Sequence, residues 1–153
     1  MAKSEQIAQV MEVTPEDTAR TYAVLCALRE GRPVMDSCES FVSWVNEKQR
    51  PEGYRLVAAF LPGTQDAVAA AGFRIHHTLS WGLMLYVDDL VTLPQYRGHG
   101  HADLLFAWLV EEARRHGCEQ LHLDSGHQRY DAHRFYLKHG MVMKAHHFSM
   151  NLD

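Results

Sequence analysis

The stretch Val91-Thr92-Leu93-Pro94-Gln95-Tyr96-Arg97-Gly98-His99-Gly100-His101-Ala102 follows an apolar run typical of a buried strand and precedes apolar residues at helical spacing. Gly98 and Gly100 permit positive φ angles and let the backbone approach a ligand closely. Backbone N–H groups from Arg97 to Ala102 are then expected to converge at a helix N-terminus, where the helix dipole favours an anion. The turn therefore predicts a pyrophosphate site, with Arg97 as a cationic contact. The alternative is a tight strand-to-helix connection without a ligand.

Two common nucleotide-binding loops are disfavoured by the same stretch. It lacks the Lys-Ser/Thr pair of a nucleoside-triphosphate loop. It also lacks the third glycine of a dinucleotide fingerprint, because Asp103 follows Ala102. Neither ATP nor NAD is the expected ligand.

The pattern outside the turn predicts an α/β fold with a mixed sheet, and not a doubly wound repeat of equal units. Strands are expected at 6–13, 54–60, 67–80, 81–93, 121–123 and 141–152, with 54–60 and 67–80 forming a hairpin. Helices are expected from Thr14 (as N-cap) to about Arg29, from Asp36 or Ser37 to 51–53, at 101–116 and at 129–138. A chain of 153 residues with 46% hydrophobic residues has room for one core, so residues 1–153 are expected to form a single domain.

Two segments together resemble a known family. Gln95-x-x-Gly98-x-Gly100 is similar to the acyl-CoA-binding motif of the GNAT superfamily of N-acetyltransferases. The helix Ala132-His133-Arg134-Phe135-Tyr136-Leu137-Lys138-His139-Gly140-Met141 resembles the second signature of that superfamily. The resemblance is closest to the polyamine and thialysine members. It implies a central twisted, mostly antiparallel sheet flanked by helices, with acetyl-CoA as cosubstrate.

The resemblance also implies which residues hold the cosubstrate. The pantetheine arm is expected to pair with the backbone at the end of the strand, and the phosphates to bind at the turn. The implied residues are Leu90, Val91, Thr92, Gln95, Arg97, Gly98, His99, Gly100, His101 and Ala102. The family often has an asparagine seven residues before the tyrosine, where this chain has Arg129. Arg129 is expected either to reach a phosphate or to lie in a solvated loop.

Acetyl transfer to an amine needs a base for the ammonium group and an acid for the departing thiolate. Asp88 and Asp89 are the candidates for the base, and consecutive residues on a regular strand point to opposite faces unless a bulge intervenes. The resemblance implies Asp88 as the base, with Asp89 as a second acid that binds substrate or is structural. It implies Tyr136 as the acid, since a phenol is protonated at pH 7.

Composition excludes several other classes. A net charge of −4 disfavours a nucleic-acid partner and weakly favours a cationic substrate. The three cysteines lack metal or redox spacing, and the 11 histidines form no metal-binding pattern, so no metal is expected. No signal peptide or apolar run long enough for a bilayer occurs, which predicts a cytoplasmic protein with no membrane partner.

The sequence thus predicts an N-acetyltransferase that moves an acetyl group to a primary amine of a small cationic metabolite by direct attack. Two alternatives stay open. One is acetylation of a protein lysine or N-terminus, and the other is a non-catalytic acyl-CoA-binding sensor. A homodimer is compatible with the apolar residues near the C-terminus, but the sequence does not establish it.

Overall fold

The computed structural model describes residues 7–152. Chain contacts divide it into two compact units, 1–122 and 123–153, which are described here in turn. The expectation of one domain across 1–153 stays a prediction. Residues 1–6, which include the start of the first expected strand, lie outside the described residues.

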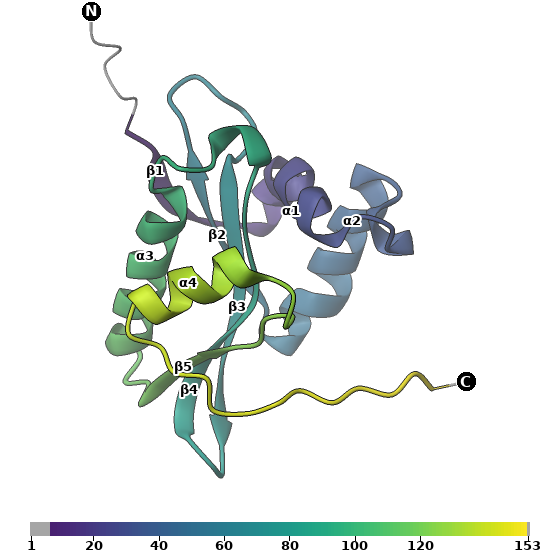
Figure 1. Ribbon diagram of the computed structural model, residues 1–153. Coiled ribbons are helices and arrows are strands. Elements are labelled where there is room, and N and C mark those ends of the chain that lie inside the picture. The colour runs from purple at the N-terminus through teal and green to yellow at the C-terminus, as the bar shows by residue number, and fades with distance from the viewer. Residues whose placement is uncertain (1–6, 153) are drawn as a thin grey trace, which may run out of the picture. The chain divides into compact units, whose positions relative to one another are not determined.

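One five-stranded sheet has the order β1-β2-β3-β4-β5 (Figure 1). The strands are β1 Gln9–Val13, β2 Arg55–Phe60, β3 Ala69–Thr78, β4 Gly82–Thr92 and β5 Gln120–Leu123. The pairs β1–β2, β2–β3 and β3–β4 are antiparallel, and a helix connects β4 to β5. The predicted mixed, mostly antiparallel sheet and the 54–60/67–80 hairpin are confirmed.

The segment between β1 and β2 is helical, as expected, but only part of it is regular α-helix. Its elements are the 3₁₀-helix η1 Pro15–Thr21, α1 Tyr22–Arg29, the 3₁₀-helix η2 Pro33–Met35, α2 Cys38–Trp44, the π-helix η3 Val45–Gln49 and the 3₁₀-helix η4 Arg50–Glu52. Thr14 precedes η1 without a capping hydrogen bond from its side chain. Ser37 does cap α2, because its Oγ accepts from the Ser40 amide at 3.0 Å.

The core on this side joins α1 and α2 to the sheet. Val24 and Phe41 from the helices pack with Leu56, Ala58 and Ala70 from the strands, and all are buried. Alanine dominates the centre of β2 and β3, so the helices meet a surface of small side chains there.

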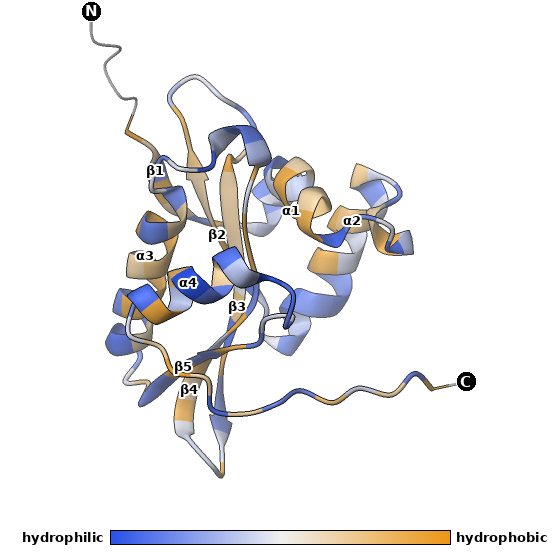
Figure 2. Ribbon diagram, viewed as in Figure 1, coloured by the Kyte–Doolittle hydropathy of each residue, from blue (hydrophilic) through white to orange (hydrophobic). Residues whose placement is uncertain are grey.

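The opposite side of the sheet carries α3 His101–Arg115 (Figure 1). Leu105 and Leu109 are fully buried, and Trp108 meets Phe73 of β3 edge to face at 5.7 Å. Figure 2 shows hydrophobic and hydrophilic residues alternating along α3, as expected for a helix with one face on a sheet and one in solvent.

The second unit contains α4 Tyr130–Lys138, which matches the helix expected at 129–138. The strand expected at 141–152 is wrong, since these residues form no regular element. An extended apolar segment becomes a strand only when a neighbour supplies backbone hydrogen bonds. Among the described residues of this unit, the last hydrogen bond between backbone groups runs from Met141 N to Tyr136 O, at the end of α4.

Within residues 7–152, no helix is both long and apolar enough to span a bilayer.

Candidate active site

β4 has a bulge at its two acidic residues. Gly72 of β3 pairs with Asp89, whereas the next residue, Phe73, pairs with Val87. Asp88 is therefore an extra residue with no partner across the ladder, and it shifts the alternation of side chains beyond it. Asp88 and Asp89 consequently lie on the same face of the sheet, the one covered by α1. The bulge that both acids need in order to face one substrate is therefore present.

Asp88 is bound by Arg74 from the neighbouring strand. Arg74 Nε donates to Asp88 Oδ2 at 3.0 Å, and Arg74 Nη2 donates to Asp88 Oδ1 at 2.8 Å. Burial raises the pKa of the Asp88 carboxyl, and the hydrogen bonds and charge of Arg74 oppose that rise. His76, two residues further along β3, adds a weaker opposing charge. Asp88 thus combines a desolvated carboxylate with a guanidinium partner.

Asp89 is tied to the surrounding structure more firmly. The Tyr54 hydroxyl donates to Asp89 Oδ2 at 2.7 Å, and Arg29 Nε donates to Asp89 Oδ1 at 2.9 Å. Arg29 Nη2 also donates to the backbone oxygen of Asp88 at 3.0 Å, so the last residue of α1 fastens that helix to the bulge. Burial, followed by the charge of Asp89, raises the pKa of Tyr54 well above its ordinary value and keeps the phenol a donor.

Gly72 leaves the space that the Tyr54 phenol occupies. A Cβ atom at Gly72 would overlap the Tyr54 hydroxyl and ring. The hydrogen bond from Tyr54 to Asp89 therefore depends on a glycine opposite Asp89.

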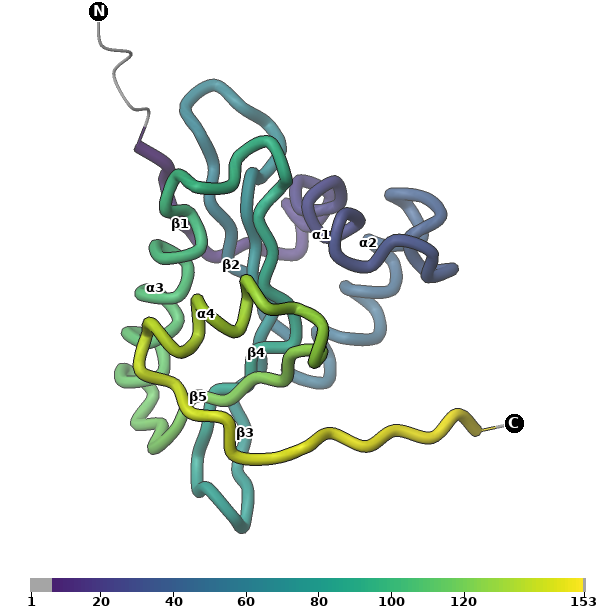
Figure 3. The backbone as a smooth tube through the Cα atoms, in the orientation of Figure 1, coloured from purple at the N-terminus to yellow at the C-terminus, as the bar shows by residue number. Residues whose placement is uncertain are grey.

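The glycine turn connects the end of β4 to α3 (Figure 3). It begins with the 3₁₀-helix η5 Pro94–Tyr96, and then Gly98 and Gly100 adopt φ angles of 79° and 80°. Both glycines are exposed, with no atom within 4 Å of where a Cβ would stand. The hydrogen bond from Leu104 N to Gly100 O, at 3.1 Å, opens α3, so the N–H groups of its first turn point out of the helix end. These features fit a phosphate group.

The side chains of the turn divide into two sets. Gln95, Arg97 and His99 are exposed, which leaves them accessible to a ligand. His101 is buried, its Nδ1 has no hydrogen-bond partner, and burial lowers its pKa, with the charge of His99 adding to this effect. A contact of His101 with cosubstrate would therefore use the backbone.

The end of β4, where pantetheine is expected to pair, is partly engaged already. Leu90, Val91 and Thr92 pair with Ala71, Ala70 and Ala69 of β3 along one edge. On the other edge, the contact with the β5 side starts at Leu83 O, which accepts from Glu119 N at 2.8 Å. Four residues of β5 are too few to follow the eleven residues of β4 to its end.

The remaining predicted residues, Arg129 and Tyr136, lie in the second unit. Arg129 is the N-cap residue of α4. Tyr136 follows two turns later, so the two residues share one side of the helix. The ring centroids of Phe135 and His139 are 4.5 Å apart, and those of Phe135 and Tyr136 are 5.8 Å apart.

The family follows from comparison with known proteins. The family model described as Acetyltransferase (GNAT) family matches residues 18–141. The chain belongs to the GNAT family of acetyltransferases. As the sequence predicted, it is an N-acetyltransferase, and enzymes of this family use acetyl-CoA.

Relatives of this GNAT enzyme are named for amine substrates. The chain is 32% identical over 144 residues to an aminoalkylphosphonate N-acetyltransferase of Salmonella typhimurium, covering 92% of this chain and 90% of the relative. It is 29% identical over 80 residues to a mouse thialysine N-epsilon-acetyltransferase, covering 49% and 47%. The solved structure of AAC(6')-Iy with a bisubstrate analogue, CoA-S-monomethyl-acetylneamine, has the same fold, with a TM-score of 0.79, 14% identity and coverage of 96% and 99%.

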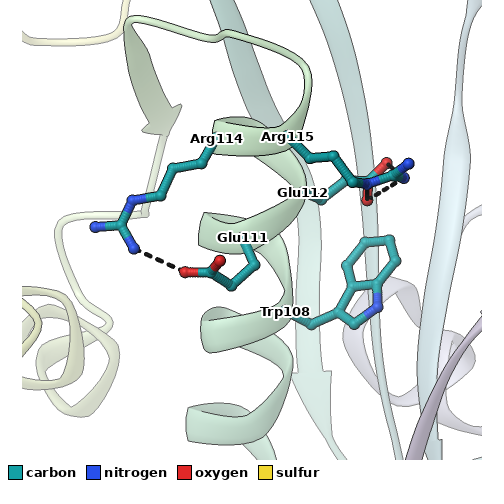
Figure 4. Close-up of a pocket in the computed structure, with 5 residues that line it drawn as sticks. All are labelled: Trp108, Glu111, Glu112, Arg114 and Arg115. Atoms are coloured by element: carbon teal, nitrogen blue, oxygen red, sulfur yellow. Dashed lines mark hydrogen bonds and ion pairs between the residues drawn. The ribbon is translucent and has the colours of Figure 1, made fainter.

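A surface hollow on α3 of this acetyltransferase contains none of the predicted site residues. Figure 4 shows its lining, which comes entirely from that helix: Trp108, Glu111, Glu112, Arg114 and Arg115. Ion pairs link Arg114 to Glu111 and Arg115 to Glu112, both at 2.7 Å. The hollow is thus a charged helix surface, on the opposite side of the sheet from the acid pair.

No three His, Cys, Asp or Glu side chains within residues 7–152 are grouped to hold a metal.

Sequence reasoning missed the residues that hold the acid pair of this GNAT enzyme. Arg29, Arg74 and Tyr54 were not among the candidates, although Arg74 binds the Asp88 carboxylate and the other two bind the Asp89 carboxylate. One signal was available for Arg74, because a cation within an apolar strand needs a partner. Arg29 and Tyr54 carry no such signal, since their roles depend on packing between distant segments.

Proposed function

We propose that this enzyme transfers the acetyl group of acetyl-CoA to the primary amine of a small metabolite by direct attack. The observation that carries the proposal is the bulge on β4. It presents Asp88 and Asp89 on one face of a strand that leads straight into the glycine turn. The amine-named relatives support the choice of nucleophile.

The cosubstrate would be held along the end of β4 and the turn. When bound, acetyl-CoA supplies the thioester that is attacked. The backbone at Leu90, Val91 and Thr92 would pair with its extended arm, and the amides from Arg97 to Ala102 would hold its phosphates. Gln95 and the side chains of Arg97 and His99 are exposed beside those amides. Arg129 at the N-terminus of α4 is a further cation for an anionic group.

The proton transfers are assigned to three side chains. Asp88 is the proposed base, supported by burial that raises its pKa and makes it a better proton acceptor. Asp89 is proposed to contribute to substrate binding, from a position fixed by Arg29 and Tyr54. Tyr136 is the proposed acid that protonates the leaving sulfur.

The acid pair no longer argues for a cationic substrate, because each carboxylate already has an arginine partner. The name of the Salmonella relative describes a substrate with both an amine and a phosphonate. We therefore propose small amines in general as acceptors and include those that carry an anion.

The proposal is tested by measuring CoA release from acetyl-CoA with a panel of amines. The panel contains polyamines, amino acids, aminoalkylphosphonates, aminoglycosides and a lysine peptide, with hydrolysis in the absence of amine subtracted. Turnover with one class of small amine supports the proposal. Turnover with the lysine peptide alone would replace it with protein acetylation, and acetyl-CoA binding without turnover on any amine would replace it with the sensor function.

A further inference from the structure

The acids at the bulge are more buried than the arginines that bind them. The side chain of Asp88 is 22% exposed and that of Arg74 is 39% exposed. The corresponding values are 13% for Asp89 and 48% for Arg29. A small molecule that approaches this face therefore meets guanidinium groups before it meets carboxylates, and the four charges sum to zero.

The geometry of Asp88 conflicts with its proposed role as a base. Both of its oxygens accept hydrogen bonds from Arg74, at 3.0 and 2.8 Å. Hydrogen bonds to the charged form of a carboxylate stabilise that form and weaken it as a proton acceptor. Asp88 becomes a stronger proton acceptor when Arg74 releases one or both of its oxygens.

Arg74 is placed so that it can change partner. Besides its two hydrogen bonds to Asp88, its guanidinium lies over the Tyr86 ring, 6.0 Å from the ring centre, a contact that does not depend on Asp88. Tyr86 is the residue opposite Arg74 in the β3–β4 ladder, so this contact belongs to the sheet itself. Arg29 differs, because it is held by the Asp89 side chain and the Asp88 backbone together.

We propose that Arg74 is the specificity-determining residue of this site, and that it binds an anionic group on the amine substrate. In moving from Asp88 to that anion, Arg74 frees the carboxylate to act as the base. A guanidinium binds phosphonate and carboxylate groups through two parallel hydrogen bonds, as it binds Asp88 here. The substrate class is therefore small primary amines that also carry such an anion. This inference rests on the proposed acetyl transfer.

The proton and bond changes balance without another reactant. One proton passes from the substrate ammonium to an Asp88 oxygen, and the freed electron pair of the amine forms the new C–N bond. The C–S bond breaks, and the sulfur receives a proton from Tyr136, the proposed acid. The nitrogen, which still carries two protons after the attack, loses one of them to solvent as the amide forms, and the Tyr136 phenolate regains a proton from solvent. Asp88 afterwards releases its proton to solvent and pairs with Arg74 again.

The experiment compares kcat/KM for matched amines of similar length. Aminoethylphosphonate and β-alanine carry different anions, propylamine carries none, and putrescine carries a second cation. We expect the wild-type enzyme to favour one or both anionic amines over propylamine by at least about tenfold, given the usual strength of charged hydrogen bonds. Comparison of the phosphonate with the carboxylate identifies which anion fits.

Arg74→Gln is the decisive variant, and Arg114→Gln on the far side of the sheet is its control. Arg74→Gln is expected to lower kcat/KM for the preferred anionic amine by about 10- to 100-fold, the loss of one charged hydrogen-bonding pair. For propylamine, the loss in kcat/KM should be smaller by about tenfold or more, because propylamine has no anion for Arg74 to bind. Arg74→Lys should fall between the two. Arg114→Gln should match the wild type on every amine.

Two results would overturn the inference. One is an equal loss for all four amines in Arg74→Gln, which indicates a purely structural role. The other is a wild-type preference for putrescine over the anionic amines. If no amine is acetylated, the proposed function fails, and calorimetric binding of aminoethylphosphonate to the wild type and Arg74→Gln then decides the role of Arg74.

Discussion

Asp88 and Asp89 are consecutive residues on β4, yet both carboxylates lie on the face of the sheet that α1 covers. A regular strand would place one of them toward α3, among apolar side chains. The bulge avoids the cost of burying a charge there and gives each acid its own arginine. The two carboxylates thus point to the same face of the sheet but have different hydrogen-bond partners.

Substitution of Asp88 and substitution of Asp89 should cause different kinds of defect. Asp88→Asn is expected to lower kcat by about 100-fold or more, the usual contribution of a general base, with little change in KM for acetyl-CoA. Asp89→Asn is expected to raise KM for the amine and to lower the free energy of unfolding, since it removes the charge that Arg29 and the Tyr54 hydroxyl share. Initial rates and urea unfolding of both variants check this. A larger loss of turnover in Asp89→Asn would exchange the two roles.

Gly72 should tolerate no side chain while Tyr54 is present. Gly72→Ala is expected to lower the free energy of unfolding by about 1–3 kcal/mol, because its Cβ overlaps the Tyr54 phenol and the surrounding core must shift. In a Tyr54→Leu background the same change should cost less, since the ring is gone. Urea unfolding of the two single variants and the double variant measures this coupling. Additive costs would show that the overlap is relieved without involving Tyr54.

The sequence predicted the parts of the fold that depend on local pattern. The glycine turn and α3 were placed correctly, because positive φ at Gly98 and Gly100 and helical periodicity after them are local properties. The sequence allowed a bulge at Asp88 and Asp89 but did not predict it. The bulge depends on how the residues of β3 pair with those of β4. The order of apolar residues in β4 does not distinguish a bulged pairing from a regular one.

The rest of the site could not be read from the sequence for a physical reason. Arg29 and Asp89 are 60 positions apart, and only the packing of α1 on the sheet brings them together. The strand expected at 141–152 failed for a related reason, since alternating apolar residues specify burial but not a hydrogen-bonding neighbour. Partners that come from distant segments decide both cases.

The backbone of the glycine turn should contribute to acetyl-CoA binding, and two glycine variants can separate this effect from the cost of backbone strain. Gly100→Ala and Gly63→Ala place a methyl group at nearly equal φ angles, 80° and 77°, with open space around both. Each is expected to cost about 1–2 kcal/mol of stability from the left-handed conformation. Only Gly100→Ala should also raise KM for acetyl-CoA, because Gly63 lies in the turn between β2 and β3. Equal KM values for the two variants would remove the turn from the proposed binding site.

Tyr136 is expected to act after cosubstrate has bound. Tyr136→Phe keeps the aromatic ring that meets Phe135 and removes only the hydroxyl. Turnover should fall about 10²-fold, in the usual range for a lost general acid, while the dissociation constant of CoA changes little. Steady-state rates and calorimetry with CoA measure both quantities. Leu137→Ala, a change in the same helix that leaves the hydroxyl in place, is the control for damage to α4, and turnover equal to wild type in Tyr136→Phe would remove Tyr136 from the mechanism.

Glu112 should make the stability of the protein sensitive to acid. Its side chain is only 5% exposed. Burial raises the pKa of the carboxyl, but hydrogen bonds from Arg115, Arg55 and His116 outweigh it, so the pKa falls from 4.5 to about 2. Because the folded state holds the carboxylate ionised, this contribution is complete above pH 4.5 and is lost as the pH falls toward 2. This pKa shift corresponds to a contribution of the Glu112 carboxylate to the free energy of unfolding on the order of 3 kcal/mol.

The test of this acid sensitivity is urea unfolding of the wild type and Glu112→Gln at a series of pH values. The variant should be less stable by a few kcal/mol near neutral pH, with the difference shrinking below pH 4.5 as the wild type loses its ionised carboxylate. Glu111→Gln is the matched control, since the Glu111 side chain is 73% exposed in its ion pair with Arg114. An exposed pair contributes little, so this variant should follow the wild type at every pH. A difference between the wild type and Glu112→Gln that stays constant with pH would mean that packing, and not the charge of Glu112, sets its contribution.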